Sequence, residues 1–181
     1  MTGSQVFKRI WKSCLTTLVT STITSASFPA AMYLLTSSDY NAKSVWFCSF
    51  FLPATVFFVF SIGDVLGRIT SSLVPLPSYN LLWQISHFRV VLIPCIYLCN
   101  MNPGHVTWFF QGDIWAPFFN LILAWSHGHF ISLAALYGTG MVQGRKGKCL
   151  AGTLLSFFLV QGLLSGVVMA FPLLRAIRPP P

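Results

Sequence analysis

The chain has 181 residues, of which 55% are hydrophobic and only 8% are charged, and its mean hydropathy is +0.71. A soluble domain carries roughly 25% charged residues, so this composition excludes a water-soluble globular fold and indicates a membrane protein. The net charge of +8 comes from 11 basic and 3 acidic residues. The basic residues are too scattered to follow a phosphate backbone, which argues against nucleic-acid binding. A basic surplus in a membrane protein is instead typical of cytosolic loops.

Five stretches are apolar and long enough to cross a membrane, because a helical span needs roughly 20 apolar residues. Lipid offers no partner for backbone polar groups, so each stretch is predicted to be a helix. We therefore expect one all-α transmembrane domain over residues 1–181, with no room for a soluble catalytic domain between the spans. The approximate spans are 13–35, 44–74, 81–101, 114–137 and 149–174.

The basic residues are divided unequally between the two sides of this arrangement. A cytosolic N-terminus places eight of them on or toward the cytosolic side and three on the other side. This asymmetry predicts a cytosolic N-terminus and an extracytosolic C-terminus. The eight are Lys8, Arg9, Lys12, Arg68, Arg89, Arg145, Lys146 and Lys148, and the three are Lys43, Arg175 and Arg178.

Asp64 and Arg68 are charged residues inside the second stretch. Their i,i+4 spacing places them on one helix face, where they can pair. Either the helix ends near Asp64 and both charges lie among headgroups, or it runs on to Val74 and Asp64 lies roughly 15 Å from its end. We prefer the second alternative, in which the pair faces a cavity or a partner. Phe57 and Ser61 lie on the same face, at i,i+4,i+7 with Asp64.

Other residues in these stretches have structural or functional interpretations. Gly67 would allow another helix to approach closely. In the first stretch, Ser21, Thr24 and Phe28 share a face that either lines a polar path or packs against a helix, and neither is preferred. Arg89 is either an anchor pointing toward the cytosolic end of the third stretch, which we prefer, or a second charge in a cavity.

The chain shows no arrangement typical of a catalytic or metal site. His127 and His129 are two residues apart and do not share a helix face, and no further zinc ligands are found beside them. The five cysteines are an odd number and lie largely in apolar stretches, so we interpret them as packing residues. We therefore predict no catalytic residue, no metal and no cofactor. An intramembrane enzyme using His127, His129 or Asp113 is a minor alternative.

Several short motifs follow one another in an order that resembles a known family. The segment Asp64-Val-Leu-Gly67-Arg68 resembles the Asp-x-x-Gly-Arg motif on the eighth helix of equilibrative nucleoside transporters. The order and spacing hold across nearly all of the chain. The matches to the seventh, ninth, tenth and eleventh helices are Phe28-Pro29, then Arg89 to Pro94 with Leu98-Cys99-Asn100, then Ser126-His127-Gly128-His129 with Ser132-Leu133, then Ala151-Gly152 through Gly166.

This resemblance implies a facilitative carrier with a major-facilitator-like bundle of six plus five helices, of which the chain corresponds to the C-terminal five. Such carriers move purine and pyrimidine nucleosides, and sometimes nucleobases, down their gradients without a cofactor. The resemblance implies that Asp64 accepts hydrogen bonds from sugar hydroxyls and that Arg68 donates to the sugar or pairs with Asp64. The other implied substrate-binding residues are Phe28, Phe57 and Ser61, and the implied structural or gating residues are Gly67, Arg89, Pro94 and Asn100.

The sequence also departs from the family pattern. Gly63 stands where many members have a bulkier residue and Ser61 where an asparagine is common. His127 and His129 replace the asparagine and tyrosine of the tenth-helix motif. These departures bear on substrate preference.

The expected partners are nucleosides, the lipid bilayer and either the missing six helices or a full-length carrier, and the expected location is the plasma membrane. Because five helices alone leave the Asp64 face open to lipid, we expect that residues 1–181 do not transport by themselves. The second interpretation is a truncated, non-transporting membrane interaction protein that associates with a full-length carrier.

Overall fold

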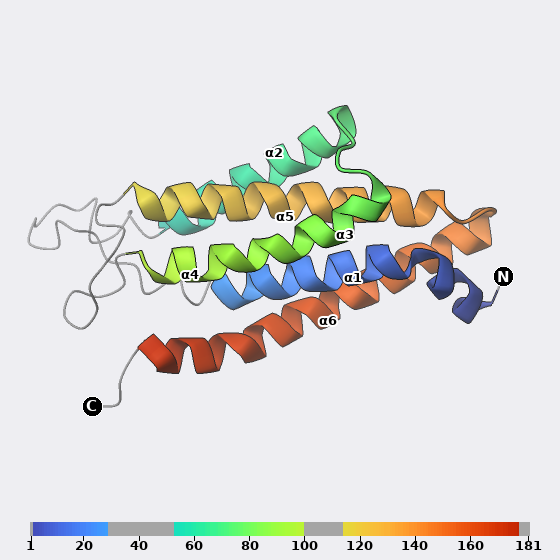
Figure 1. Ribbon diagram of the computed structural model, residues 1–181. Coiled ribbons are helices and arrows are strands. Elements are labelled where there is room, and N and C mark those ends of the chain that lie inside the picture. Colours follow the sequence, from blue (N-terminus) through green and yellow to red (C-terminus); the bar gives the residue numbers. More distant parts are fainter. Residues whose placement is uncertain (1, 29–52, 100–113, 178–181) are drawn as a thin grey trace, which may run out of the picture.

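The computed structural model describes residues 2–28, 53–99 and 114–177, which form a bundle of helices that run roughly along one axis (Figure 1). No β-strand occurs within these ranges, so the predicted all-α class is confirmed for them. The elements in chain order are α1 (Gly3–Ser27), the π-helix η3 (Pro53–Phe58), α2 (Val59–Leu73), α3 (Tyr79–Phe88), the 3-10 helix η4 (Arg89–Val91), α4 (Leu92–Tyr97), α5 (Trp115–Gly140) and α6 (Arg145–Ile177).

Three of the described helices are long and apolar enough to cross a membrane, namely Pro53–Leu73, Trp115–Gly140 and Arg145–Leu173. They correspond to the second, fourth and fifth predicted spans, and they identify a helical membrane protein. The first predicted span overlaps α1, which begins at Gly3 rather than near residue 13. Residues 29–35, 44–52 and 100–101 of the predicted spans lie outside the described residues, so the count of five spans stays a prediction.

The third predicted span is divided into α3, η4 and α4 rather than forming one α-helix. The tighter turn at η4 is marked by the Leu92 N–H, which bonds the Arg89 carbonyl three residues earlier. Pro94 has no backbone N–H, so it cannot donate the α-helical hydrogen bond to the carbonyl of Val90. The change from α-helix to 3-10 helix therefore occurs where a proline removes the α-helical hydrogen bond to the Val90 carbonyl.

A second irregular turn, η3, leads into α2 and is held by α5. A π-helix departs from the regular i to i−4 hydrogen bonding of an α-helix. The fully buried Asn120 of α5 donates from Nδ2 to the carbonyls of Thr55 and Val56, each at 2.8 Å. This side-chain amide therefore fixes the start of the helix that carries Asp64.

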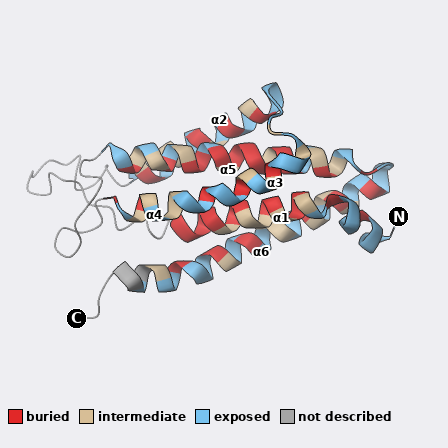
Figure 2. Ribbon diagram, viewed as in Figure 1, coloured by how far each residue is buried: buried red, intermediate tan, exposed pale blue. Residues whose placement is uncertain are grey.

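The buried residues gather on α1 and α5, which occupy the centre of the bundle (Figure 2). Helix α1 packs most extensively against α6, and α2 packs most extensively against α5. A Cβ atom added at Gly166 of α6 would collide with the Thr22 carbonyl and the Ser25 side chain of α1. The Thr22 and Ser165 hydroxyls lie 2.9 Å apart across the same contact. Small residues thus let the two backbones approach closely.

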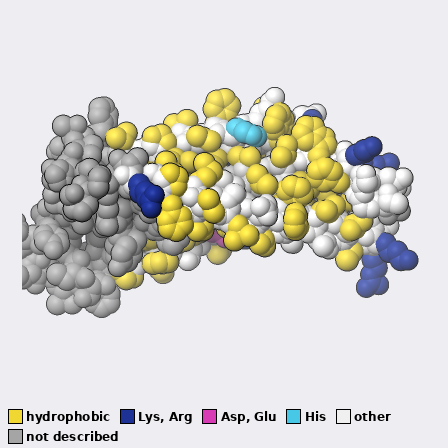
Figure 3. All heavy atoms as spheres, turned by 90° about the horizontal axis from the view of Figure 1, so that it is seen from below, with side chains coloured by type: hydrophobic (Ala, Val, Ile, Leu, Met, Phe, Trp, Pro, Cys, Tyr) yellow, Lys and Arg dark blue, Asp and Glu magenta, His cyan; other side chains and the backbone are white. Residues whose placement is uncertain are grey.

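Most Lys and Arg side chains visible in Figure 3 gather at the end of the bundle where α1 begins and α5 passes into α6, while apolar side chains cover the flank. The starts of α1 and α6 lie at this same end of the bundle (Figure 1). Phe7 and Phe158 stack at this end with ring centroids 5.8 Å apart. The prediction from the sequence also places these basic residues together, on the cytosolic side. The orientation itself stays a prediction.

Replacing Gly166 by alanine should destabilise the bundle, because the added methyl group has no space against the α1 backbone. Overpacking of this kind typically costs about 1–3 kcal/mol. We expect the purified chain in detergent to have a lower apparent melting temperature, measured by tryptophan fluorescence. Gly152→Ala on the same helix is the matched control, since nothing lies within 4 Å of its added Cβ. An equal loss in both variants would contradict the proposed packing.

Candidate substrate-binding site

The candidate site lies where α2 and α5 approach each other through glycines. A Cβ atom added at Gly67 of α2 would collide with the Trp125 carbonyl of α5. A Cβ atom added at Gly128 of α5 would collide with the Asp64 carbonyl of α2. Since neither position carries a side chain, the two backbones come into contact. This contact brings Asp64 against the stretch of α5 that carries His127.

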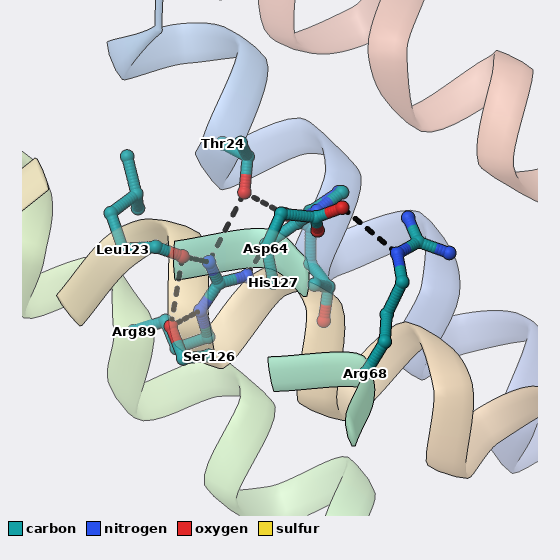
Figure 4. Close-up of polar contacts among 8 residues, drawn as sticks. Thr24, Asp64, Arg68, Arg89, Leu123, Ser126 and His127 are labelled. Carbon is teal, nitrogen blue, oxygen red and sulfur yellow. Dashed lines mark hydrogen bonds and ion pairs between the residues drawn. The ribbon is translucent and has the colours of Figure 1, made fainter. Parts of the chain in front are cut away.

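The Asp64 carboxylate is held from two sides (Figure 4). Its Oδ2 accepts a hydrogen bond from Arg68 Nε at 2.8 Å, and its Oδ1 lies 2.9 Å from His127 Nδ1. The i,i+4 pairing predicted from the sequence is formed, and α2 continues past it to Leu73. The side chain of Asp64 is 18% exposed and that of Arg68 is 52% exposed. The pair therefore reaches from the bundle interior to its surface.

Asp64 also lies deep within an apolar helix. The candidate span runs over Pro53–Leu73, so Asp64 is near its middle, about 14 Å from its Leu73 end at the rise of an α-helix. A charged side chain at such a depth is costly unless it is paired or faces a polar space. Its two hydrogen-bond partners, Arg68 and His127, reduce this cost.

Aromatic rings gather next to this carboxylate. Phe28 stacks on Phe60 with centroids 4.1 Å apart and meets Phe57 edge-on at 5.5 Å. The Phe60 ring lies 6.1 Å from that of His127. The structure thus joins Phe28 and Phe57, both expected from the sequence, and adds Phe60. Phe60 was not predicted, although it precedes Asp64 by four residues and so shares its helix face.

The serine and threonine residues that the sequence analysis named lie in different environments. Ser61 is exposed, and its hydroxyl donates to the Phe57 carbonyl on its own helix at 2.8 Å. Ser21 is buried beside Gly162 of α6, which supports the packing interpretation for this residue. Thr24 instead faces the bundle interior, where its hydroxyl accepts a hydrogen bond at 3.1 Å from Arg89 Nη2.

Arg89 is a second charged group inside the bundle, only 4% exposed. Its Nε donates to the Ser126 hydroxyl at 2.9 Å, and its Nη1 donates to the Thr20 carbonyl at 3.0 Å. Its Nη2 donates to the Thr24 hydroxyl at 3.1 Å and to the Leu123 carbonyl at 2.8 Å. One guanidinium therefore connects η4 to both central helices, α1 and α5 (Figure 4).

The preferred interpretation of Arg89 as an outward-pointing anchor is wrong. All four of its hydrogen bonds go to α1 and α5, and none of these acceptors carries a charge. A guanidinium presents five N–H donors in a rigid plane, so converging acceptors compensate for the loss of water around it. The sequence could not show that these acceptors, which lie far away in the chain, converge on this side chain.

His127 and His129 of α5 face different partners, as their spacing predicts. His129 is 5% exposed, its Nε2 lies 2.6 Å from the Leu76 carbonyl, and its Nδ1 lies 3.2 Å from the Thr70 hydroxyl. His129 thus ties the connection between α2 and α3 to α5. Across the described ranges, no group of three or more histidine, cysteine or acidic residues is placed to hold a metal. Asn100, expected to have a structural or gating role, lies outside the described residues.

These features define a helical membrane protein with a paired carboxylate inside one of its apolar helices. Residues 2–175 match the family model described as Nucleoside transporter, so the chain belongs to the nucleoside transporter family. The resemblance predicted from the motifs is thereby confirmed. The members compared below are named as transporters, which supports the prediction at family level that the chain is not an enzyme.

Three relatives show how much of their own length the chain matches. It is 33% identical over 175 residues to equilibrative nucleoside transporter 1 of Rattus norvegicus, covering 95% of the chain and 38% of the relative. It is 35% identical over 159 residues to the Homo sapiens protein of the same name, covering 86% and 34%. It is 31% identical over 169 residues to equilibrative nucleoside transporter 2 of Rattus norvegicus, covering 92% and 36%. The chain thus spans little more than one third of the length of these relatives.

Replacing Arg89 by lysine should destabilise the bundle although the charge is kept. An ammonium group cannot reproduce the planar set of donors that reaches α1 and α5 together, so buried acceptors lose their partner. We expect a loss of about 1–3 kcal/mol, seen as a lower apparent melting temperature in detergent. Arg145→Lys, at an exposed position, is the matched control and should stay within about 0.5 kcal/mol of the unmodified chain. Unchanged stability in Arg89→Lys would contradict the role assigned to these hydrogen bonds.

Proposed function

We propose that the chain is the C-terminal part of a facilitative nucleoside carrier and that Asp64 and Arg68 form the centre of its substrate site. The observation that carries this proposal is the charged pair near the middle of an apolar helix, with Arg68 half exposed beside the more buried Asp64. Family membership supports nucleosides as the substrate class. The members compared above are named as equilibrative nucleoside transporters.

The chemistry of the pair suits a polar sugar. An ionised carboxylate offers about four lone-pair positions, so Asp64 can accept from sugar hydroxyls while it keeps Arg68 and His127. Among the described residues Arg68 is bonded only through Nε, so its Nη groups can donate to sugar oxygens. Phe28 and Phe57 would lie beside the flat base, and Ser61 follows on the same side of α2. No cofactor or coupled ion enters this proposal.

The wider architecture belongs to the same proposal. It has five spans with a cytosolic N-terminus and an extracytosolic C-terminus, arranged as the second part of a major-facilitator-like bundle. The six remaining helices would complete the cavity wall in front of α2. The exposure of large apolar residues on α2 supports such a cover or direct contact with lipid, with Val65 at 54% and Ile69 at 49%. Gly67 and Pro94 would act as structural elements of this bundle, and Arg89 would hold its central helices together.

We keep a second candidate function beside it. In this alternative the chain is a truncated membrane interaction protein that associates with a full-length carrier and does not transport. The two functions share the membrane location, for which we propose the plasma membrane. They differ in whether residues 1–181 contribute a substrate site.

A chimera tests the leading proposal directly. Residues 1–181 replace the matching part of rat equilibrative nucleoside transporter 1, and uptake of labelled uridine and adenosine is measured in proteoliposomes. We expect saturable uptake, which falls at least about tenfold in Asp64→Asn and in Arg68→Ala, because each loses a charge-assisted hydrogen bond to the substrate. Arg145→Ala is the matched control for the loss of an arginine and should transport like the unmodified chimera.

The chain on its own provides the second comparison. Residues 1–181 in proteoliposomes should give uptake no greater than empty vesicles, and saturable uptake would instead indicate a self-assembled dimer. A working chimera that is insensitive to both substitutions would overturn the assigned site. Reduced uptake by a full-length carrier when residues 1–181 are co-reconstituted would favour the interaction protein.

A further inference from the structure

His127 lies between the Asp64 carboxylate and the aromatic rings beside it. Its side chain is only 14% exposed, and its Nδ1 lies 2.9 Å from Asp64 Oδ1. The Phe60 ring is 6.1 Å away on the neighbouring helix. The imidazole therefore forms part of the same wall as the charged pair and the phenylalanines.

The hydrogen-bond partner of Nδ1 determines which nitrogen of the His127 ring carries the hydrogen. Asp64 is paired with Arg68, and an ionised carboxylate can only accept hydrogen bonds. The hydrogen between Asp64 and His127 must therefore belong to Nδ1. In a neutral imidazole one nitrogen carries the hydrogen and the other carries a lone pair. In the neutral ring, Asp64 thus makes Nε2 a hydrogen-bond acceptor.

This acceptor is not used within the described part of the chain. His127 is hydrogen-bonded there through Nδ1 alone, and Nε2 contacts no donor. His129 provides the contrast on the same helix, because both of its ring nitrogens have partners, the Thr70 hydroxyl and the Leu76 carbonyl. Of these two histidines, His127 alone has a ring nitrogen without a hydrogen-bond partner among the described residues.

We infer that His127 is a specificity-determining residue that accepts a hydrogen bond at Nε2 from a sugar hydroxyl of the nucleoside while its Nδ1–H holds Asp64 in place. The Asp64 carboxylate lies beyond Nδ1 and the bare Nε2 lies across the same ring, so the two acceptors can each take one hydroxyl donor of a single sugar, such as the 2′- and 3′-hydroxyls of ribose. A sugar that lacks one of these hydroxyls leaves one acceptor unpaired. The identity of the ligand rests on the proposed function, whereas the tautomer of His127 does not.

The tautomer is tested on residues 1–181 without any transport. The chain is labelled with ¹⁵N-histidine in lipid nanodiscs, and the ring signals of His127 are identified by their loss in His127→Asn. At neutral pH we expect a protonated Nδ1 and a bare Nε2. Protonation at Nε2 alone, or at both nitrogens, would overturn the inference because no acceptor would remain.

The role in specificity is tested in the chimera with uridine, 2′-deoxyuridine and 3′-deoxyuridine. We expect the unmodified chimera to favour uridine over at least one deoxy analogue by about three- to tenfold, and His127→Phe to bring that ratio close to one. His87→Phe, at an exposed histidine of α3, is the matched control and should leave the ratio unchanged.

The loss of uptake, compared among the three substrates, distinguishes the possible roles of His127. Equal losses for all three substrates in His127→Phe would make the residue a support for Asp64 alone and would overturn its role as an acceptor. No uptake by the unmodified chimera would overturn the proposed function and, with it, the sugar as the ligand. The ¹⁵N measurement would then still decide whether Nε2 is bare.

Discussion

A buried arginine sets the main constraint on this bundle. Within the described part of the chain Arg89 has no acidic partner, yet it is 4% exposed among apolar helices. Removing such a group from water is costly unless its donors are satisfied. Four hydrogen bonds that Arg89 donates to α1 and α5 meet this requirement, two of them to backbone carbonyls. The two central helices must therefore keep both their separation and their register for Arg89 to remain inside.

The candidate site depends on a second constraint, the lack of side chains where α2 meets α5. Gly67 and Gly128 let the backbones touch, and this brings Asp64 within hydrogen-bond reach of His127. The carboxylate then has one partner on its own helix and one on its neighbour. A partner on a neighbouring helix fixes the direction of a side chain more firmly than an i,i+4 pair alone. The glycines thus serve the site although neither can contact a ligand through a side chain.

The polar groups of the interior divide into two sets with different surroundings. Arg89, Ser126 and Thr24 bond to one another or to backbone and connect helices inside the bundle. Asp64 and Arg68 lie at its edge, where the half-exposed guanidinium is bonded through Nε alone among the described residues. The first set explains how the helices hold together, and the second is the one to which the proposed function assigns the substrate. His127 lies between the two sets and belongs to the second through its bond to Asp64.

The sequence by itself determined the membrane class, the helical character, the pairing of Asp64 with Arg68 and the family. These features follow from composition and from spacings of a few residues, which a helix converts directly into contacts. Only the tertiary structure decided that Arg89 points inward, that His127 meets Asp64 and that Phe60 joins Phe28. These contacts link residues that are far apart in the chain, such as Thr20 with Arg89 and Asp64 with His127. No local spacing specifies them, because they arise from which helices pack together and at what register.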